Sequence, residues 1–333
     1  MIRRCALTLI LLVAAAPAIR AQEDAAALEQ TFAAAARHVA PSLVGITMEW
    51  KPGKAALPAT PAAPSYVRGN GPVSGVIISA DGLIATSDFG VNSDVKSLKV
   101  KLADGRTFDG TLLGNDVSRG IQIIRIDAKG LPVPRFAQNG DVRVGRWAIA
   151  CGFGETPSLS VGIVSATERI GGRAIQVDAS TNPTNYGGAI VDVQGRLMGI
   201  ITPLTAAGTR AGLQLYDSGI GFAVPIGDIM SNLPRLEAGE TVQAAFLGIS
   251  FDMRKMTGGA YVQQVLKDTG AEKAGILTGD AITEFNGEAI HTPFKLLHVI
   301  GKCRVGDTVT FKVLRDGKPV ELTATLGPRP TAP

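Results

Sequence analysis

Short runs of β-branched and aliphatic residues, separated by turn dipeptides, dominate the chain from residue 73 to residue 224. The runs VSGVIIS and LIATS flank Asp81-Gly82, and the runs SLKVKL and RTFDGTLLG flank Asp104-Gly105. An Asp-Gly pair between two such runs predicts a β-hairpin. Further runs lie at residues 121–126, 146–151, 160–166, 174–179, 189–193, 196–202 and 219–224. So many short strands with little helix predict a mainly β barrel or sandwich rather than alternating βαβ units.

The pattern changes at Ala244. The strand-like run FLGISF is followed by GAYVQQVL, the short helical AEKAGI, a helix around residues 294–300 and a hairpin across Asp316-Gly317. These elements predict a compact α+β module over residues 244–327, preceded by a polar linker at 236–243 and followed by a disordered tail at 328–333. A chain of 333 residues has room for about two domains of roughly 150 residues each, so two unlike domains fit its length.

The first 21 residues have the composition of a secretory signal peptide. MIRR is a basic start, CALTLILLVAAA is an apolar run, and APAIRA is a small-residue stretch that ends at Ala21. The apolar run is shorter than the roughly 20 residues that span a bilayer, although an uncleaved anchor is the alternative. The sequence therefore predicts a soluble exported protein, located in the periplasm or the cell envelope, with its signal cleaved near Ala21.

The charge of the chain argues against a nucleic-acid partner. The chain has 33 basic and 29 acidic residues, and three of the basic ones lie in the predicted signal peptide. Because the remainder is nearly neutral, we expect no nucleic-acid partner.

Cys151 and Cys303 lie in different predicted domains without metal-ligand spacing, so we expect two buried thiols, with a disulfide between domains as the alternative. The sequence predicts neither a metal site nor a cofactor.

Several motifs, in order, resemble those of the HtrA/Deg family of exported serine proteases. They are HVAPSLVGI, SGVIISADGLIATS, GNDVSRGIQIIRI, GRWAIACGF, SVGIVSATER, NPTNYGGAIVDVQGRLMGI and GIGFAVPI, followed by FLGI, AGILTGDAITEFNG and VGDTVTFKVLRDGK. The resemblance covers nearly everything after residue 21. It implies a trypsin-like double β-barrel at residues 22–235 and a small α+β PDZ domain at residues 244–327.

The resemblance places the family's catalytic positions on residues of other types. Phe89, in the run TSDFG, stands where the family has histidine, Gly120 stands where it has aspartate, and Tyr186 stands where it has serine. Thr184 replaces the glycine two positions before that serine. Because a β-branched residue tolerates a positive φ badly, we expect an altered oxyanion loop.

We find no replacement for the missing base. The sequence has no histidine between Ala40 and Ile290, and a phenol is a poor nucleophile for acyl transfer. Asp88 and Asp116 lie near the missing positions and are expected to be exposed turn carboxylates. We therefore expect no catalytic residue and a protein that is not an enzyme, a pseudoprotease that binds peptides or regulates. The alternative is a serine-type endopeptidase of envelope protein quality control with a non-standard site.

The predicted PDZ domain keeps the features of a peptide-binding site. The resemblance places Phe246, Leu247, Gly248 and Ile249 on the turn that holds a peptide carboxylate and on the start of the strand beside it. Leu296 and Ile300, four residues apart on the following helix, are expected to line the groove or the core beneath it. The implied partners are peptide C-termini or unfolded exported proteins, with an active HtrA/Deg relative as a further alternative. The family also implies a homo-oligomer, a trimer.

Overall fold

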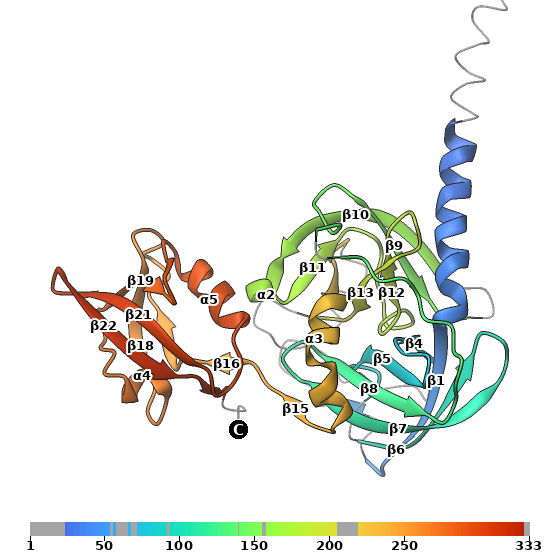
Figure 1. Ribbon diagram of the computed structural model, residues 1–333, viewed down its shortest axis with the longest axis horizontal. Helices are drawn as coiled ribbons and strands as arrows, with labels where there is room; N and C mark the ends of the chain where they lie inside the picture. Colours follow the sequence, from blue (N-terminus) through green and yellow to red (C-terminus); the bar gives the residue numbers. More distant parts are fainter. Residues whose placement is uncertain are drawn as a thin grey trace, which may run out of the picture.

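A computed structural model describes residues 24–53, 72–91, 94–138, 140–154, 158–204 and 219–329, and the backbone of residues 56–57 and 66–67. The predicted signal peptide lies outside these residues. Figure 1 shows two β-barrels joined to a smaller α+β unit, as the mainly β fold prediction requires. Among the described residues, no helix combines the length and the apolarity needed to cross a bilayer.

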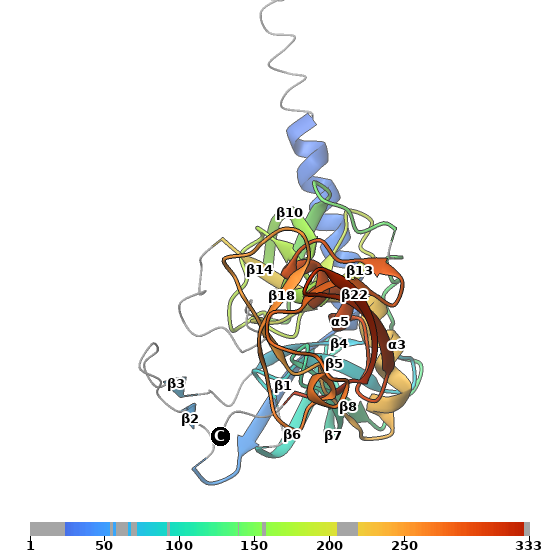
Figure 2. The same ribbon diagram turned by 90° about the vertical axis from the view of Figure 1, so that its left-hand side faces the viewer.

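The first barrel is a closed ring of six antiparallel strands in the order β7-β6-β1-β4-β5-β8, with β8 paired back to β7. Its strands are β1 (Leu43–Trp50), β4 (Val73–Ile77), β5 (Leu83–Ser87), β6 (Val95–Leu102), β7 (Thr107–Asp116) and β8 (Ile121–Ile126). Both predicted Asp-Gly hairpins form, as β4–β5 and β6–β7. The short pair β2 (Ala56–Leu57) and β3 (Tyr66–Val67) lies outside the barrels (Figure 2).

The second barrel closes in the order β10-β11-β14-β13-β12-β9. Its strands are β9 (Trp147–Gly152), β10 (Ser158–Glu168), β11 (Ala174–Val177), β12 (Ala189–Val191), β13 (Leu197–Ile201) and β14 (Gly221–Pro225). Aliphatic side chains from these strands fill the barrel, and a separate apolar cluster joins the two barrels. The sharp turns that connect β5, β7 and β12 to their neighbours therefore meet at this junction.

Helices at both ends of the barrel unit cover it. The helix at residues 24–39 leads into the 3-10 turn η1 (Ala40–Ser42). The ring of Phe32 packs edge-on against that of Trp147, with ring centroids 5.1 Å apart. At the other end, α3 (Ile226–Glu237) packs against strands of both barrels, and β15 (Thr241–Val242) pairs in parallel with β7. The predicted linker at 236–243 is thus packed against the barrel, although its boundaries stay a prediction.

The C-terminal unit is built around the sheet β17-β18-β19-β21-β22. Its elements are β16 (Ala245–Phe246), β17 (Ile249–Phe251), β18 (Ala260–Val265), α4 (Gly270–Lys273), β19 (Ala281–Phe285), β20 (Glu288–Ala289), α5 (Pro293–Gly301), β21 (Thr308–Arg315), β22 (Lys318–Thr325) and β23 (Gly327–Pro328). The helix α5 and the hairpin β21–β22 agree with the sequence prediction. Phe285, Leu296 and Val313 contribute to its separate core.

The two units touch where α5 meets a tight turn of the second barrel. This turn, α2 (Arg169–Gly172), contains left-handed backbone, with φ of +57° at Ile170 and +66° at Gly171. A Cβ atom on Gly301 of α5 would lie 2.1 Å from the Gly171 carbonyl oxygen. The glycine at position 301 is therefore needed for the close approach of the two backbones.

Candidate functional site

The three positions predicted to replace a catalytic triad come together at the junction of the barrels. Phe89 follows β5 and Tyr186 precedes β12, and their rings meet edge-to-face with centroids 5.4 Å apart. Gly120, in the turn before β8, accepts a hydrogen bond of 2.9 Å from the Asp88 N–H. Tyr186 is only 8% exposed and packs with the core of the second barrel. The junction is therefore filled by aromatic rings.

The loop that carries Tyr186 uses its own backbone donors. The Thr184 N–H donates to Asn182 Oδ1 at 3.0 Å, and the Asn185 and Tyr186 N–H groups both donate to the Asn182 carbonyl at 3.0 and 3.1 Å. Gly187 and Gly188 donate to the carbonyls of Ile201 and Asn185 at 2.8 and 2.9 Å. Oxyanion binding requires N–H groups that point at the developing charge. In this conformation, all five N–H groups point at acceptors of the protein.

Two hydroxyl groups lie beside these positions, and sequence reasoning missed both. The oxygens of Ser87 and Thr202 are 3.4 Å apart, and the side chains are 1% and 2% exposed. Asp88 is 3% exposed and Asp116 is 2% exposed, so the expectation that both carboxylates are exposed is wrong. The reason is that the turns after β5 and β7 lie between the barrels and not at the surface. The run TSDFG signals Ser87, whereas Thr202 is brought in only by the fold.

The predicted carboxylate-binding turn of the PDZ domain lies between β16 and β17. Gly248 has a φ of +96°, and a Cβ atom there would lie 2.1 Å from Thr269 Oγ1. The carbonyls of Leu247 and Gly248 accept hydrogen bonds from Ala271 and Leu266, both at 2.8 Å, which hold the turn in place. Within the described chain, the N–H groups of Leu247 and Gly248 have no acceptor. These two residues are buried, and their N–H groups are donors that the described chain leaves unused.

The strand after this turn has a free edge. β17 pairs with β18 on one side and ends the sheet on the other. Because Leu266 donates to the Gly248 carbonyl, Ile249 and Val265 form a non-hydrogen-bonded pair. The N–H and C=O of Ile249 consequently point away from β18, toward the open edge, where an added strand would pair with them.

The remaining predicted peptide-binding residues have other surroundings. Leu296 is fully buried and Ile300 is 7% exposed, and both belong to the PDZ core together with Leu247. Leu296 and Ile300 were predicted to lie in the groove or in the core beneath it, and the structure places both in the core. The partly buried Ile249 packs against this core. The ring of Phe246 lies under the guanidinium of Arg329, 5.7 Å from its carbon. Sequence reasoning missed Thr269, whose contact with Gly248 depends on the tertiary fold.

The cysteines differ in burial, and neither forms a disulfide. Burial raises the pKa of Cys151, inside the second barrel, to about 12. Burial and then the charge of Asp307 also raise the pKa of Cys303, which is half-buried and donates to the Val299 carbonyl at 3.4 Å. In the described part of the chain, no group of three or more His, Cys, Asp or Glu side chains is placed to hold a metal.

Comparisons with known proteins agree with this architecture. A family model of the trypsin-like peptidase domain matches residues 73–200, and a model of the PDZ domain matches residues 245–326. The chain is similar to a probable periplasmic serine endoprotease DegP-like of Marinomonas sp., with 33% identity over 78% of this chain and 58% of the relative. It is also 36% identical to the periplasmic serine endoprotease DegP of Escherichia coli, over 76% of this chain and 56% of the relative.

Solved structures give the same result. The HtrA-type protease AlgW with a decapeptide superposes with a TM-score of 0.70 and 27% identity, covering 90% of this chain and 99% of that one. A serine endoprotease from Yersinia pestis superposes with a TM-score of 0.67 and 28% identity, covering 90% of this chain and 98% of that one. The chain spans a little over half the length of the curated relatives, at 56–58%.

These relatives contradict the prediction that the chain is not an enzyme, because they are named as serine endoproteases and HtrA-type proteases. That prediction considered the three standard positions, the histidines, and Asp88 and Asp116 as exposed carboxylates. It left out Ser87 and Thr202, which the fold brings to the same junction as Asp88. With a trypsin-like peptidase domain followed by one PDZ domain, the chain belongs to the HtrA/Deg family.

Proposed function

We propose that this protein works in protein quality control in the periplasm, where its PDZ domain captures the C-termini of exported polypeptides. One observation carries the proposal. The unpaired N–H groups of Leu247 and Gly248 lie next to the free edge of β17. A peptide that adds to this edge as a strand would place its terminal carboxylate at those two donors.

The chemistry of the turn determines what it would bind. Main-chain hydrogen bonds to Ile249 supply affinity with little dependence on the peptide sequence. The apolar core under the turn, including Leu247 and Leu296, favours an apolar last side chain. The names of the DegP relatives support the periplasm as the location. Cleavage of a signal peptide near Ala21, assembly into a trimer and pairing with an active relative stay predictions.

A titration of the full chain with peptides tests this function. A peptide with a free C-terminus and an apolar last residue should bind with a Kd on the order of micromolar, near 8 kcal/mol. Its amidated form should bind at least about tenfold more weakly, because the amide brings no negative charge to the turn. Equal binding of the two forms would contradict capture through the carboxylate.

A matched pair of glycine variants locates the binding site. Gly248 and Gly279 both have a φ of +96°, so a side chain strains the backbone equally at either position. Only at Gly248 would the new Cβ atom collide with Thr269, whereas the space around Gly279 is open. Gly248→Val should therefore weaken peptide binding about tenfold or more, while Gly279→Val should leave it close to that of the parent. The same affinity in both variants would place the site elsewhere.

A second function, a serine-type endopeptidase with a non-standard site, is supported by the names of the relatives. We infer that Phe89, Gly120 and Tyr186 occupy the standard catalytic positions, so another nucleophile is required. Ser87, which contacts Thr202 and is followed by Asp88, is the candidate. Its oxygen would add to the scissile carbonyl, and its proton would pass to the carboxylate of Asp88 and then to the leaving amine, because the sequence has no histidine between residues 40 and 290. Ser87 is 1% exposed, so substrate reaches its hydroxyl only after the barrel junction opens.

Cleavage of unfolded casein by the purified chain tests this second function. Ser87→Ala should abolish cleavage, and Ser97→Ala should preserve it, because Ser97 is an exposed hydroxyl on β6 that contacts Glu49. Cleavage that is the same in both variants would come from another residue or another protein. If the parent chain does not cleave casein, the endopeptidase function is ruled out.

A further inference from the structure

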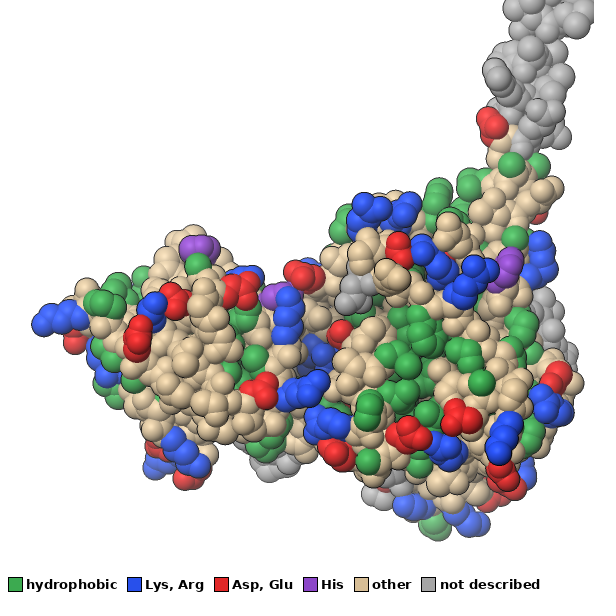
Figure 3. Space-filling model, in the orientation of Figure 1, with side chains coloured by type: hydrophobic (Ala, Val, Ile, Leu, Met, Phe, Trp, Pro, Cys, Tyr) green, Lys and Arg blue, Asp and Glu red, His purple; other side chains and the backbone are tan. Residues whose placement is uncertain are grey.

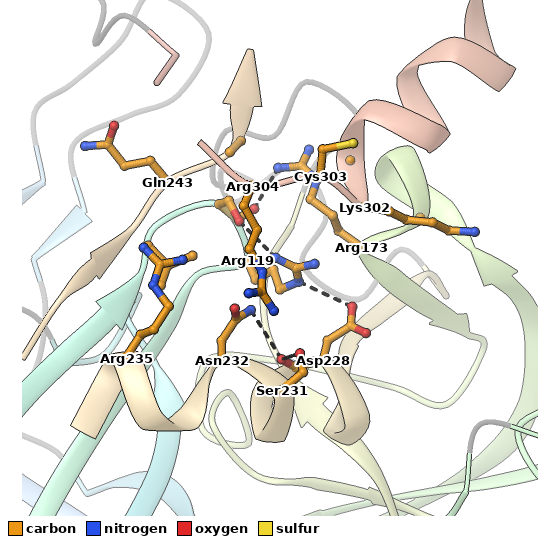
Figure 4. A pocket seen from close by; sticks show the side chains of 15 residues that line it. Arg119, Arg173, Asp228, Ser231, Asn232, Arg235, Gln243, Lys302, Cys303 and Arg304 are labelled. Atoms are coloured by element: carbon orange, nitrogen blue, oxygen red, sulfur yellow. Dashed lines mark hydrogen bonds and ion pairs between the residues drawn. The ribbon is translucent and has the colours of Figure 1, made fainter. Parts of the chain in front are cut away.

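A cavity of about 250 Å³ lies between the barrel unit and the PDZ domain. Figure 4 shows that it is bounded on one side by α3, with Ser231, Asn232 and Arg235, and on the other by the chain that follows α5. The PDZ domain contributes Lys302 and Arg304 there. The cavity is separate from both the barrel junction and the free edge of β17.

The side chains around this cavity are mostly cationic. Arg119, Arg173, Arg235, Lys302 and Arg304 line it together with a single carboxylate, that of Asp228. Figure 3 shows Lys and Arg side chains gathered where the two units meet. Apart from this boundary the chain is nearly neutral, so the concentration of cations here is a local feature.

Three of the five cations have carboxylate partners. Arg119 lies 3.3 Å from Asp228 and 3.2 Å from Asp116, Arg235 lies 2.8 Å from Glu240, and Lys302 lies 3.9 Å from Glu168.

Arg173 and Arg304 differ from these three. Arg173 donates to the carbonyl oxygens of Ile170 and Ser118, at 2.9 and 2.7 Å. Neither Arg173 nor Arg304 forms an ion pair within the residues that the structure describes. One guanidinium from each domain is therefore without a direct ion pair, and only the more distant charge of Asp116 acts on Arg173.

The two barrel arginines are crowded together. Arg119 Nη1 lies 3.3 Å from the Ser118 hydroxyl, and Arg173 Nη1 donates to the Ser118 carbonyl, so both guanidinium groups contact one residue. Burial, and then the charge of Arg119, lower the pKa of Arg173. Arg304 extends from the PDZ domain toward Arg119 in the same space (Figure 4). Like charges held this close favour an anion between them.

We propose that this cavity binds a phosphate group that contacts Arg304 of the PDZ domain and Arg119 and Arg173 of the barrel unit. The planar guanidinium presents paired N–H donors that match phosphate oxygens, and a multiply charged oxyanion serves several guanidinium groups at once. The volume accommodates a diphosphate or a small phosphate ester. Because the ligand contacts both domains, its binding fixes the PDZ domain against the barrels.

Titration calorimetry and thermal unfolding of the full chain in chloride buffer test this site. Pyrophosphate is the first probe, and glycerol 3-phosphate distinguishes an ester from a free anion. Binding of the anion should be saturable, with a Kd below about 1 mM, and should raise Tm by about 2–4 °C near saturation. Sodium chloride at matched ionic strength should not reproduce the rise. An equal rise with chloride would show that only screening is involved and would overturn the proposal.

Two arginine variants of the PDZ domain distinguish binding at this cavity from a general effect of the protein's charge. Arg304→Gln removes a cavity cation without breaking an ion pair, and it should weaken pyrophosphate binding about tenfold or more, as expected for the loss of a charged hydrogen bond. Arg254→Gln removes the same charge from an exposed side chain that pairs with Asp252, outside the cavity, and should leave the Kd unchanged. Equal weakening in both variants, or none in Arg304→Gln, would overturn the site.

Discussion

In the loop around Tyr186, five successive N–H groups donate within the protein, whereas the turn at Leu247 and Gly248 leaves two N–H groups without an acceptor. Both segments are tight, glycine-containing turns that precede a short strand. The barrel loop closes on itself through Asn182 and fills its centre with an aromatic ring. The PDZ turn is held from outside, through its carbonyls, and its donors stay open.

This difference shows that the shape of a loop does not define a binding site. An anion needs donors that the folded chain has not already satisfied, and these depend on the partners of each N–H group. The same distinction separates Tyr186, a ring packed in a core, from Gly248, a residue whose missing side chain lets the turn pack closely against Thr269.

Removing the ring of Tyr186 should have the largest effect on stability. The side chain is buried against Phe89, so Tyr186→Ala should lower the free energy of unfolding of the barrel unit by about 3–5 kcal/mol. Tyr186→Phe keeps the ring and should cost about 1 kcal/mol or less. Urea denaturation followed by Trp fluorescence measures both values. If Tyr186→Ala is as stable as the parent, the barrel junction is not a packed core.

A smaller loss of stability is expected when a buried carboxylate of the PDZ domain is removed. Asp280, 1% exposed, accepts hydrogen bonds from Arg315 at 2.9 and 2.8 Å and from the Leu277 N–H at 2.9 Å. Asp280→Ala leaves the Leu277 donor unsatisfied and should lower the free energy of unfolding of this domain by about 2 kcal/mol. Barrel unfolding should not change. Equal destabilisation of both units would mean that they unfold together.

The same carboxylate predicts a pH dependence. Burial would raise the pKa of Asp280, but the hydrogen bonds from Arg315 and Leu277 outweigh it and hold the pKa below its usual value. A pKa lowered in the folded state gives stability that is complete above the unfolded pKa, about 3.9, and is lost as pH falls through the folded pKa. The urea midpoint of the PDZ domain should therefore fall below about pH 4, and by less in Asp280→Ala. Parallel curves for the two proteins would contradict this.

The smallest expected effect is a difference in the rate at which the two cysteines are chemically modified. Cys151 is buried in the barrel with a pKa of about 12, and Cys303 is half-buried beside the interdomain cavity. Iodoacetamide at pH 8 should modify Cys303 slowly and leave Cys151 unmodified until the protein is unfolded, as followed by peptide mass mapping. Faster modification of Cys151 would show that the barrel opens more readily than the PDZ domain.

Local sequence patterns predicted most of the fold, and long-range packing accounts for the rest. Asp-Gly turns between apolar runs predicted the hairpins β4–β5 and β6–β7, and family motifs in order predicted the two barrels and the PDZ domain. The pairing of β15 with β7 was not predictable, because two residues carry no strand pattern of their own.

The candidate sites were predictable only in part. Residues 89, 120 and 186 were placed by motif, and the structure brings them together, but the burial of Asp88 depends on how two barrels meet. The contact of Gly248 with Thr269, and the cavity that Arg119 and Arg304 both line, join residues far apart in sequence. No local pattern signals such contacts.

Amide hydrogen exchange, with and without a C-terminal peptide, tests the contrast between the two turns most directly. Without peptide, the N–H groups of Leu247 and Gly248 should exchange quickly, and those of residues 184–188 should be protected because each has an acceptor. A peptide with a free carboxylate should slow exchange at residues 247–249, leave residues 184–188 unchanged, and lose its effect when amidated. Protection by peptide at residues 184–188 with no change at 247–249 would place peptide capture in the barrel and contradict the account.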